Sequence, residues 1–304
     1  MEYCLETNNL CKAYGHQTVL KHVTMHIPTG AIYGFVGRNG SGKTTLIRAI
    51  TGLQQPTSGS YSFFGIRNDS PDISKVRKRM GAVVESPAIY RDLSARDNLL
   101  IQARVLGLPD DSDIQEVLEL VDLADTGGKK VKNFSLGMRQ RLGIAIVLLG
   151  SPDFLILDEP VNGLDPQGIV EIRELILKLN REQQVTVLIS SHILTELSLL
   201  ATHYGFIDKG SLIKEISAKD LEDTCRKCIH VKVSNERILC TVLDRMGLEY
   251  QLSENQTADI FGTLEITEFV EVLHQEGCIV YSISEKEESL ENYYINLIGG
   301  VEHE

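Results

Sequence analysis

The sequence has no long apolar run, little cysteine and no excess of basic residues. It contains no stretch of about 18 or more consecutive uncharged apolar residues, so we do not expect a membrane-spanning helix. The first residues, Met1 to Glu6, lack the basic start and the long apolar segment of a secretory signal. Thirty Lys and Arg residues against 42 Asp and Glu residues give a formal charge of −12. That balance argues against a broad nucleic-acid-binding surface, so no nucleic acid is expected among the partners.

The six cysteines are too few for a disulfide scaffold in a chain of 304 residues. Only Cys225 and Cys228 have a suggestive spacing, and His230 lies close to them. Redox or zinc chemistry would need a thioredoxin-like setting or a second Cys/His pair at a matching distance, and neither is evident. Structural cysteines are the favoured interpretation.

Length and composition are those of an ordinary globular protein. The 304 residues predict about two domains, and 42% hydrophobic with 24% charged residues is typical of soluble proteins. The chain is long enough to bury a sizeable core.

The most informative stretch is a glycine-rich loop that matches G-x-x-x-x-G-K-[ST]. It reads Gly37-Arg38-Asn39-Gly40-Ser41-Gly42-Lys43-Thr44-Thr45. The apolar residues 31–36 predict a buried strand before it, and residues 46–50 predict a helix after it. A helix start presents free amide groups and a positive dipole end to an anion, and glycines let the backbone wrap phosphate oxygens. We therefore expect a nucleoside triphosphate here, with Lys43 on the β- and γ-phosphates and the Thr44 hydroxyl on Mg²⁺.

Two acids follow a second apolar strand, residues 154–157. Asp158 suits the metal, directly or through water, because Mg²⁺ prefers one or two carboxylates together with phosphate oxygens. Glu159 is free to take a proton from the attacking water. Contact with solvent alone is a poor explanation for two acids at this place, because charges at the end of a buried strand are costly without a partner.

Two further side chains follow apolar strands at the expected carboxyl edge of the sheet, where such folds bind ligands. His192 follows the strand at 185–189, and we favour a contact with the γ-phosphate over an ordinary loop histidine. Glu85 follows the strand at 80–84, and the residues alone leave open whether it reaches the metal or is an exposed loop acid.

Two weaker signals depend on their setting. Ser135 and Gly137 precede an apolar helix predicted at 143–149, which makes a second potential anion site, although an ordinary serine N-cap is the favoured interpretation from these residues alone. Tyr14, about 25 residues before the glycine-rich loop, can stack on a purine or be a packing aromatic.

The remaining pattern predicts a coarse order of elements. Strands are expected at 2–8 and 18–28, a turn at 57–60, a strand at 61–64 and a closing hairpin at 203–216. Amphipathic helices from about residue 93 form a helical insertion. After residue 216 the pattern changes to strand, helix, strand, strand, helix, strand and a last helix from about residue 287, which is the ferredoxin-like order.

With these motifs in place, the chain resembles the ATP-binding subunit of ABC transporters over about residues 1–216. That resemblance implies a P-loop NTPase fold of ABC type, an α/β fold with a mixed sheet and a helical insertion at about residues 93–143. Residues 217–304 are expected to be a small α+β accessory domain. Tyr14 looks like the adenine-stacking aromatic and Gly37–Thr44 like the Walker A loop. Phe134–Met138 occupies the signature position, Asp158 and Glu159 look like Walker B with the catalytic base, Gly163–Asp165 matches the D-loop, and His192 matches the switch histidine.

Two positions depart from the family pattern. The signature usually reads L-S-G-G-Q. Here Leu136 and Met138 replace residues of that motif, so only Ser135 and Gly137 remain to contact the γ-phosphate. Glu85 stands where the family has the Q-loop glutamine; its charge would tighten Mg²⁺ binding and also repel the γ-phosphate. These departures are similar to the bacitracin and lantibiotic self-protection branch.

The resemblance also implies a mechanism. ATP and Mg²⁺ are expected to lie between two copies of the chain in a head-to-tail homodimer, where Ser135, Gly137 and Asp165 of each copy meet the nucleotide of the other. Separate membrane permease subunits are expected as partners, contacted around Glu85 and the helices at 93–122, at the cytoplasmic face of the membrane. The expected function is ATP-driven export of a peptide antibiotic. Two alternatives are a soluble ABC-type ATPase acting on translation or DNA, and a regulatory protein that uses ATP only as a switch.

Overall fold

The computed structural model describes residues 2–108, 113–224, 228–253, 256–262, 264–286 and 290–299. These form two compact units, residues 1–218 and 219–304. The predicted domain boundary lies two residues before the division between the units. Cys225 lies outside the described residues, so the interpretation of Cys225 and Cys228 as structural cysteines stays a prediction. Among the described residues, no helix combines the length and the apolar character needed to cross a bilayer.

A six-stranded mixed sheet forms the centre of the first unit, with the strand order β10-β9-β3-β8-β7-β6. All neighbouring strands are parallel except β9 and β10, which form an antiparallel pair at one edge. Every residue of β3, β7 and β8 is buried, as expected for parallel strands covered on both faces. The strands are β3 (Ile32–Val36), β6 (Met80–Val83), β7 (Phe154–Asp158), β8 (Thr186–Ser191), β9 (His203–Asp208) and β10 (Ser211–Ser217).

A second sheet of the same unit is antiparallel, with the order β2-β1-β4-β5. Its strands are β1 (Tyr3–Tyr14), β2 (Gln17–Pro28), β4 (Ser58–Phe63) and β5 (Ile66–Arg67). The predicted turn at 57–60 is wrong, because Ser58 and Ser60 pair with β1 as part of β4. Glycine at position 59 favours a turn by composition, but in the structure it is needed for close packing, because a Cβ there would lie 2.2 Å from the Asn9 carbonyl oxygen.

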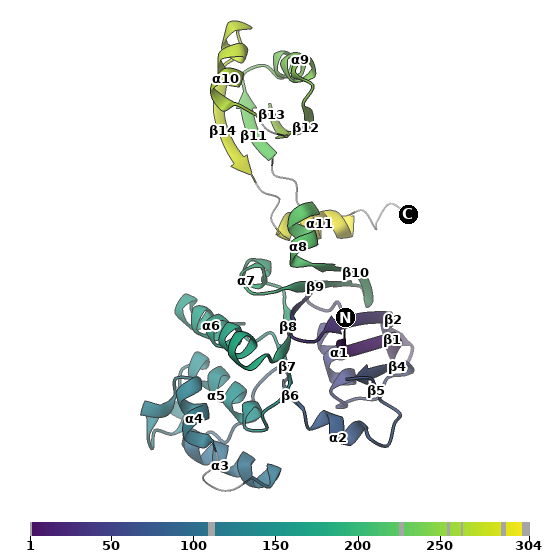
Figure 1. Cartoon of the computed structure of the whole chain (residues 1–304), viewed down its shortest axis with the longest axis vertical. Coiled ribbons are helices and arrows are strands. Elements are labelled where there is room, and N and C mark those ends of the chain that lie inside the picture. Colours follow the sequence, from purple (N-terminus) through teal and green to yellow (C-terminus); the bar gives the residue numbers. More distant parts are fainter. Residues whose placement is uncertain are drawn as a thin grey trace. The chain divides into compact units, whose positions relative to one another are not determined.

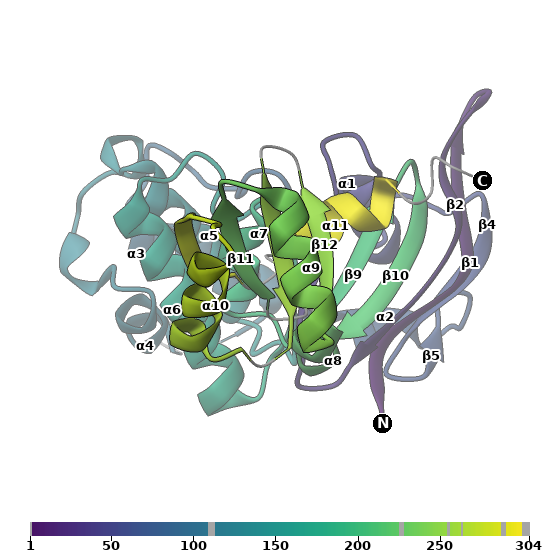
Figure 2. The same cartoon turned by 90° about the horizontal axis from the view of Figure 1, so that it is seen from above.

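Helices cover these sheets. Figures 1 and 2 both show α3 to α6 on one side of the first unit and the antiparallel sheet on the other. The helix α1 packs its apolar side chains, including Leu46 and Ile50, into the core shared with β1 and β2. The helices of this unit are α1 (Lys43–Ile50), α2 (Ile73–Arg77), α3 (Ala95–Leu106), α4 (Ile114–Leu120), α5 (Leu136–Leu148), α6 (Pro166–Gln183) and α7 (Leu194–Ser198), with 3₁₀ turns η1 (Ala124–Thr126) and η2 (Val131–Asn133).

The start of α5 corrects one prediction. The helix begins at Leu136, seven residues before the predicted Gly143, because the Ser135 hydroxyl caps it by accepting from the Met138 amide at 3.2 Å. Gln140 and Arg141 are polar, yet both are buried in the helix. Gly137 therefore lies inside the first turn of the helix.

The second unit has a four-stranded antiparallel sheet with the order β12-β13-β11-β14. Its core is formed by apolar residues of these strands and of α9 and α10, with Phe269 and Val231 fully buried. The elements are α8 (Ala218–Thr224), β11 (Cys228–Val233), α9 (Glu236–Met246), β12 (Glu249–Ser253), β13 (Thr257–Phe261), α10 (Ile266–Gln275), β14 (Val280–Lys286) and α11 (Leu290–Gly299). From β11 to β14 the element types follow the predicted order.

Candidate functional site

The register of the central sheet brings several chemistry-bearing segments to one edge. Val36, which precedes the glycine-rich loop, pairs with Ser191, and Asp158 pairs with Ser190. Val83, two residues before Glu85, pairs with Leu157. Because these strands are parallel, their carboxyl ends share one edge, so the loop, Asp158, Glu159 and His192 meet there.

The glycine-rich loop leaves β3 and enters α1 with backbone geometry that only glycine adopts easily. Gly40 and Gly42 have φ of +81° and +112°. A Cβ at Gly42 would lie 2.9 Å from Leu20 Cδ2, so the close approach of β2 also requires glycine. Arg38, Asn39 and Gly40 are exposed at the tip of the loop, while Thr44 and Thr45 are half-buried at the start of α1.

Lys43 lies folded back under this loop and is only 6% exposed. Its ammonium donates to the Gly37 carbonyl oxygen at 2.6 Å and lies 3.3 Å from Glu159 Oε1. A buried ammonium held by a carbonyl and a carboxylate is a positive charge kept in place for an anion.

Asp158 and Glu159 are both held by Ser190, the neighbouring residue on β8. The Ser190 hydroxyl donates to Asp158 Oδ1 and accepts from the Glu159 amide at 3.0 Å. Asp158 is 2% exposed, whereas the Glu159 side chain is 19% exposed. Glu159 has a φ of +50°, an unfavourable conformation for a side-chain-bearing residue that turns the chain sharply after the strand.

His192 completes this group. Its Nδ1 lies 2.7 Å from Glu159 Oε2, so Glu159 bridges Lys43 and His192 with its two oxygens. The structure thus brings together three of the predicted functional side chains from three different segments.

A cavity of about 280 Å³ opens at this place. Its lining residues are Val19, Asn39, Gly40, Gly42, Lys43, Thr44, Thr45, Glu159 and Asn162. The hydroxyl of Ser41, in the same loop, is buried and lacks a hydrogen-bond partner. An orphaned buried hydroxyl is costly, and a phosphate oxygen would satisfy it, so the loop fits a nucleotide triphosphate chain.

Glu85 lies beside α1 rather than in the lining of this cavity. Its Oε1 accepts from Arg48 Nη2 at 2.6 Å. Close by, Pro87 packs against α5, where a Cβ at Gly143 would lie 2.4 Å from the proline Cβ. The segment after β6 therefore contacts both α1 and α5.

Ser135, Gly137 and Asp165 form a second group. Asp165 caps α6 by accepting from the Gly168 amide at 3.0 Å, and Ser135 caps α5. A Cβ at Gly137 would lie 3.9 Å from Leu164 Cδ2, so the starts of α5 and α6 are neighbours. Figures 1 and 2 both show α5 apart from α1, and neither Ser135 nor Gly137 lines the cavity at the phosphate loop.

Tyr14, at the end of β1, is 44% exposed. Its hydroxyl donates to Gln54 Oε1, and the Lys12 ammonium lies 5.2 Å from the ring centroid. The ring is thus fixed at the surface, outside the cavity lining.

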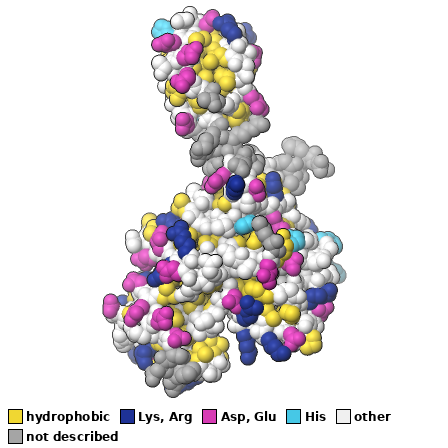
Figure 3. Space-filling view, in the orientation of Figure 1, with side chains coloured by type: hydrophobic (Ala, Val, Ile, Leu, Met, Phe, Trp, Pro, Cys, Tyr) yellow, Lys and Arg dark blue, Asp and Glu magenta, His cyan; other side chains and the backbone are white. Residues whose placement is uncertain are grey.

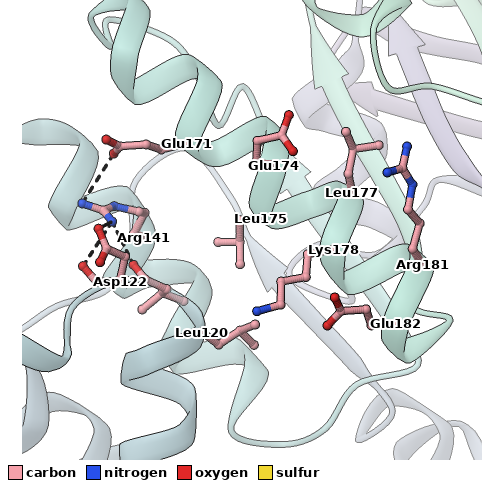
Figure 4. A pocket seen from close by; sticks show the side chains of 11 residues that line it. Leu120, Asp122, Arg141, Glu171, Glu174, Leu175, Leu177, Lys178, Arg181 and Glu182 are labelled. Atoms are coloured by element: carbon pink, nitrogen blue, oxygen red, sulfur yellow. Dashed lines mark hydrogen bonds and ion pairs between the residues drawn. The ribbon is translucent and has the colours of Figure 1, made fainter.

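The sequence pattern did not single out Ser190, Arg48 or Arg141. Ser190 is one of two serines after a buried strand, and only the β7–β8 register shows that it orders both acids. Figure 4 shows Arg141, on α5, between the end of α4 and α6. Its guanidinium donates to the carbonyl oxygens of Val121 and Asp122 at 3.0 and 3.1 Å, and lies 3.5 Å from Glu171 Oε2.

Comparisons with known proteins agree with this geometry. The model of the ABC transporter family matches residues 20–162. The bacitracin transport ATP-binding protein BcrA of Bacillus licheniformis is 41% identical over 303 residues, which cover 99% of both chains. The lantibiotic transport ATP-binding protein SrtF of Streptococcus pyogenes is 46% identical over 211 residues, covering 69% of this chain and 90% of SrtF.

Solved structures are similar as well. CbiO1 of Clostridium perfringens, part of the ABC transporter complex cbiONQ, has a TM-score of 0.66 at 27% identity and covers 81% of this chain and 97% of its own. The dimeric ATP-binding cassette MJ0796, bound to ADP and Pi in a post-hydrolysis state, has a TM-score of 0.63 at 25% identity, covering 70% of this chain and 98% of its own.

These similarities confirm the predicted family, the P-loop fold with its mixed sheet and helices, and ATP as the nucleotide. The chain belongs to the ABC transporter family, as one of its ATP-binding, ATP-hydrolysing subunits.

Proposed function

We propose that the chain is the motor subunit of a transporter that expels a peptide antibiotic of bacitracin or lantibiotic type and so gives resistance. The observation that carries the motor chemistry is the Glu159 carboxylate, 3.3 Å from Lys43 Nζ and 2.7 Å from His192 Nδ1 beside the phosphate-loop cavity. The choice of cargo follows from the relatives, which act in bacitracin and lantibiotic transport.

The phosphate chain is held by the loop amides and by Lys43, which exchanges its carbonyl and Glu159 partners for phosphate oxygens. Thr44 and Asp158 are the ligands proposed for Mg²⁺, with Glu85 joining from its exposed position. Asp158 is pre-oriented by the Ser190 hydroxyl. A bound Mg²⁺ supplies charge neutralisation at the β- and γ-phosphate oxygens.

Glu159 acts as the base that takes a proton from the attacking water. Its contact with Lys43 ends when that ammonium turns to phosphate, which leaves a carboxylate oxygen free to accept the proton. His192, hydrogen-bonded to the other oxygen, orients this carboxylate and reaches the γ-phosphate from the end of β8.

Hydrolysis involves a second copy of the chain. Ser135 and Gly137 lie at the start of α5, apart from the chain's own phosphate loop, and Asp165 lies beside them. A head-to-tail homodimer would place this group on the partner's γ-phosphate, where the helix start offers amide donors. Tyr14 is the proposed stacking platform for adenine.

The remaining proposals concern partners and place. The chain is expected at the cytoplasmic face of the membrane, bound to separate permease subunits around Glu85 and the helical insertion. Figure 3 shows both acidic and basic side chains on one face of the first unit. The second unit is proposed to be ferredoxin-like, supported by its β12-β13-β11-β14 order.

The test of the motor chemistry is steady-state phosphate release by the purified chain and by Glu159→Gln. The variant should bind ATP and lose about 10²- to 10⁴-fold in kcat, the range for a general base. Glu182→Gln, which changes an exposed acid near the end of α6, is the control and should hydrolyse normally. Normal turnover by Glu159→Gln would remove Glu159 from its role.

The test of the cargo is growth of cells that carry the chain and its permease in the presence of bacitracin-type and lantibiotic peptides. Cells with the native chain should tolerate more peptide than cells with Glu159→Gln. Equal sensitivity to every peptide would refute antibiotic export while leaving the ATPase assignment intact.

A further inference from the structure

The glutamate at position 85 raises a problem of charge. A carboxylate near the triphosphate adds a negative charge to a site that must hold several, and like charges close together repel. In this structure the charge is not left unbalanced, because Arg48 Nη2 lies 2.6 Å from Glu85 Oε1.

Arg48 is tied to the nucleotide site by its helix. It lies four residues after Thr44 on α1, so both side chains project from one face of the helix, about 6 Å apart along its axis. The ion pair thus joins Glu85 to the helix that carries the Thr44 hydroxyl proposed for Mg²⁺.

The backbone at Glu85 is strained. Its φ is +61°, and the Ser86 amide donates to the Val84 carbonyl oxygen at 2.8 Å, which closes a tight γ-turn centred on Glu85. Such a turn costs about 1–3 kcal/mol and persists only while the surroundings hold it. The ion pair with Arg48 is one of these restraints, and the packing of Pro87 on Gly143 is another.

The ion pair itself is weak enough to exchange. The Arg48 and Glu85 side chains are 34% and 57% exposed, and exposed ion pairs stabilise by about 0–1 kcal/mol. A divalent cation beside the same carboxylate offers twice the charge of the guanidinium, so it can compete for the carboxylate.

We propose that Arg48 is a positioning residue that competes with the nucleotide's divalent cation for the Glu85 carboxylate. In the nucleotide-free chain, Arg48 holds Glu85 beside α1 and balances its charge. When ATP and the cation bind, Glu85 leaves Arg48 for the metal side. This inference rests on the proposed role of Glu85 near the metal.

The test measures binding of Mn²⁺ with ATP by electron paramagnetic resonance, in full-length chains that all carry Glu159→Gln so that nucleotide is kept. Arg48→Gln should lower the Mn²⁺ concentration for half-saturation about two- to five-fold, because a competitor worth up to about 1 kcal/mol is removed. Glu85→Gln should raise that concentration. Arg48→Gln added to Glu85→Gln should then change nothing.

Lys75→Gln is the matched control. It removes the cation of an exposed ion pair with Asp72 on α2, 2.7 Å apart, and should leave Mn²⁺ binding as it is. An equal change from Lys75→Gln would show a general charge effect and overturn the proposal.

Two further outcomes would overturn the proposal but leave the proposed function intact. In the first, Arg48→Gln still changes Mn²⁺ binding in a chain that also carries Glu85→Gln. In the second, ATP and Mn²⁺ bind normally and neither Arg48→Gln nor Glu85→Gln changes that binding. If the chain with Glu159→Gln alone fails to bind ATP and Mn²⁺ together, the proposed function fails as well.

Discussion

Replacing Arg141 with methionine tests whether a buried guanidinium on α5 stabilises the C-terminal end of α4. Methionine keeps much of the apolar stem and removes all the donors. In the native chain those donors bind the carbonyl oxygens of Val121 and Asp122, just past the end of α4. That helix has seven residues and no basic residue in its last turn, so Arg141 supplies both the missing donors and the cation that a helix C-terminus favours.

The size of the effect follows from which groups lose their partner. Val121 is 1% exposed, so water cannot easily replace the guanidinium there, and an unsatisfied buried carbonyl costs about 1–3 kcal/mol. The Asp122 side chain is 89% exposed and contributes little through its ion pair. With the lost cation at the helix end, about 0.3–1 kcal/mol, we expect Arg141→Met to lower the free energy of unfolding of the first unit by about 1–4 kcal/mol.

The assay is urea unfolding followed by circular dichroism, because the chain has no tryptophan for fluorescence. Lys178→Met is the control, since Lys178 lines the same pocket as Arg141 (Figure 4) but is exposed and lies before the last turn of α6, and it should change the free energy of unfolding by no more than about 0.5 kcal/mol. If Arg141→Met cost less than about 1 kcal/mol, or no more than the control, the capping role of Arg141 would be refuted.

Two further predictions concern pH. Burial and the Glu215 carboxylate raise the pKa of Tyr33 well above its usual 10.0, and its hydroxyl donates to Glu215 Oε1 at 2.7 Å. Because the pKa of Tyr33 is raised in the folded chain, the stability that its protonated hydroxyl contributes is present below pH 10 and lost as pH rises further. In urea unfolding at increasing alkaline pH, the native chain should therefore lose more stability than Tyr33→Phe. Equal losses in the two chains would contradict the reasoning. Hydrogen bonds from Ser94 lower the pKa of Asp97 below its usual 3.8. The native chain should therefore be more stable than Asp97→Asn above pH 3.8, and this advantage should fade as pH falls below that value. An advantage that survives at pH 2 would argue against the capping box.

Much of the first unit could be predicted because its chemistry is local in sequence. The phosphate loop and the acids at 158 and 159 each follow a short run of buried apolar residues, and such runs mark central parallel strands. The start of α5 was missed because Arg141 looks like a solvent-facing residue until α4 and α6 surround it. The partner of Glu85 lies 37 residues away, so no local pattern could reveal it.

The start of strand β4 was predicted wrongly for a different reason. Ser58 and Gly59 have the composition of a turn, and local preference alone favours one. Pairing with β1 overrides that preference, because the approach of the Asn9 carbonyl leaves room only for glycine at position 59.

The close approach of Pro87 to Gly143 has a mechanical consequence. Because Gly143 has no side chain, the rigid proline ring contacts the backbone of α5 directly. A movement of α5 towards Pro87 would therefore displace the proline ring as well. Glu85, two residues before that ring, is at the same time tethered to α1 through Arg48. The short segment from Glu85 to Pro87 therefore links α1 to α5, the two helices whose first turns we propose to bind nucleotide.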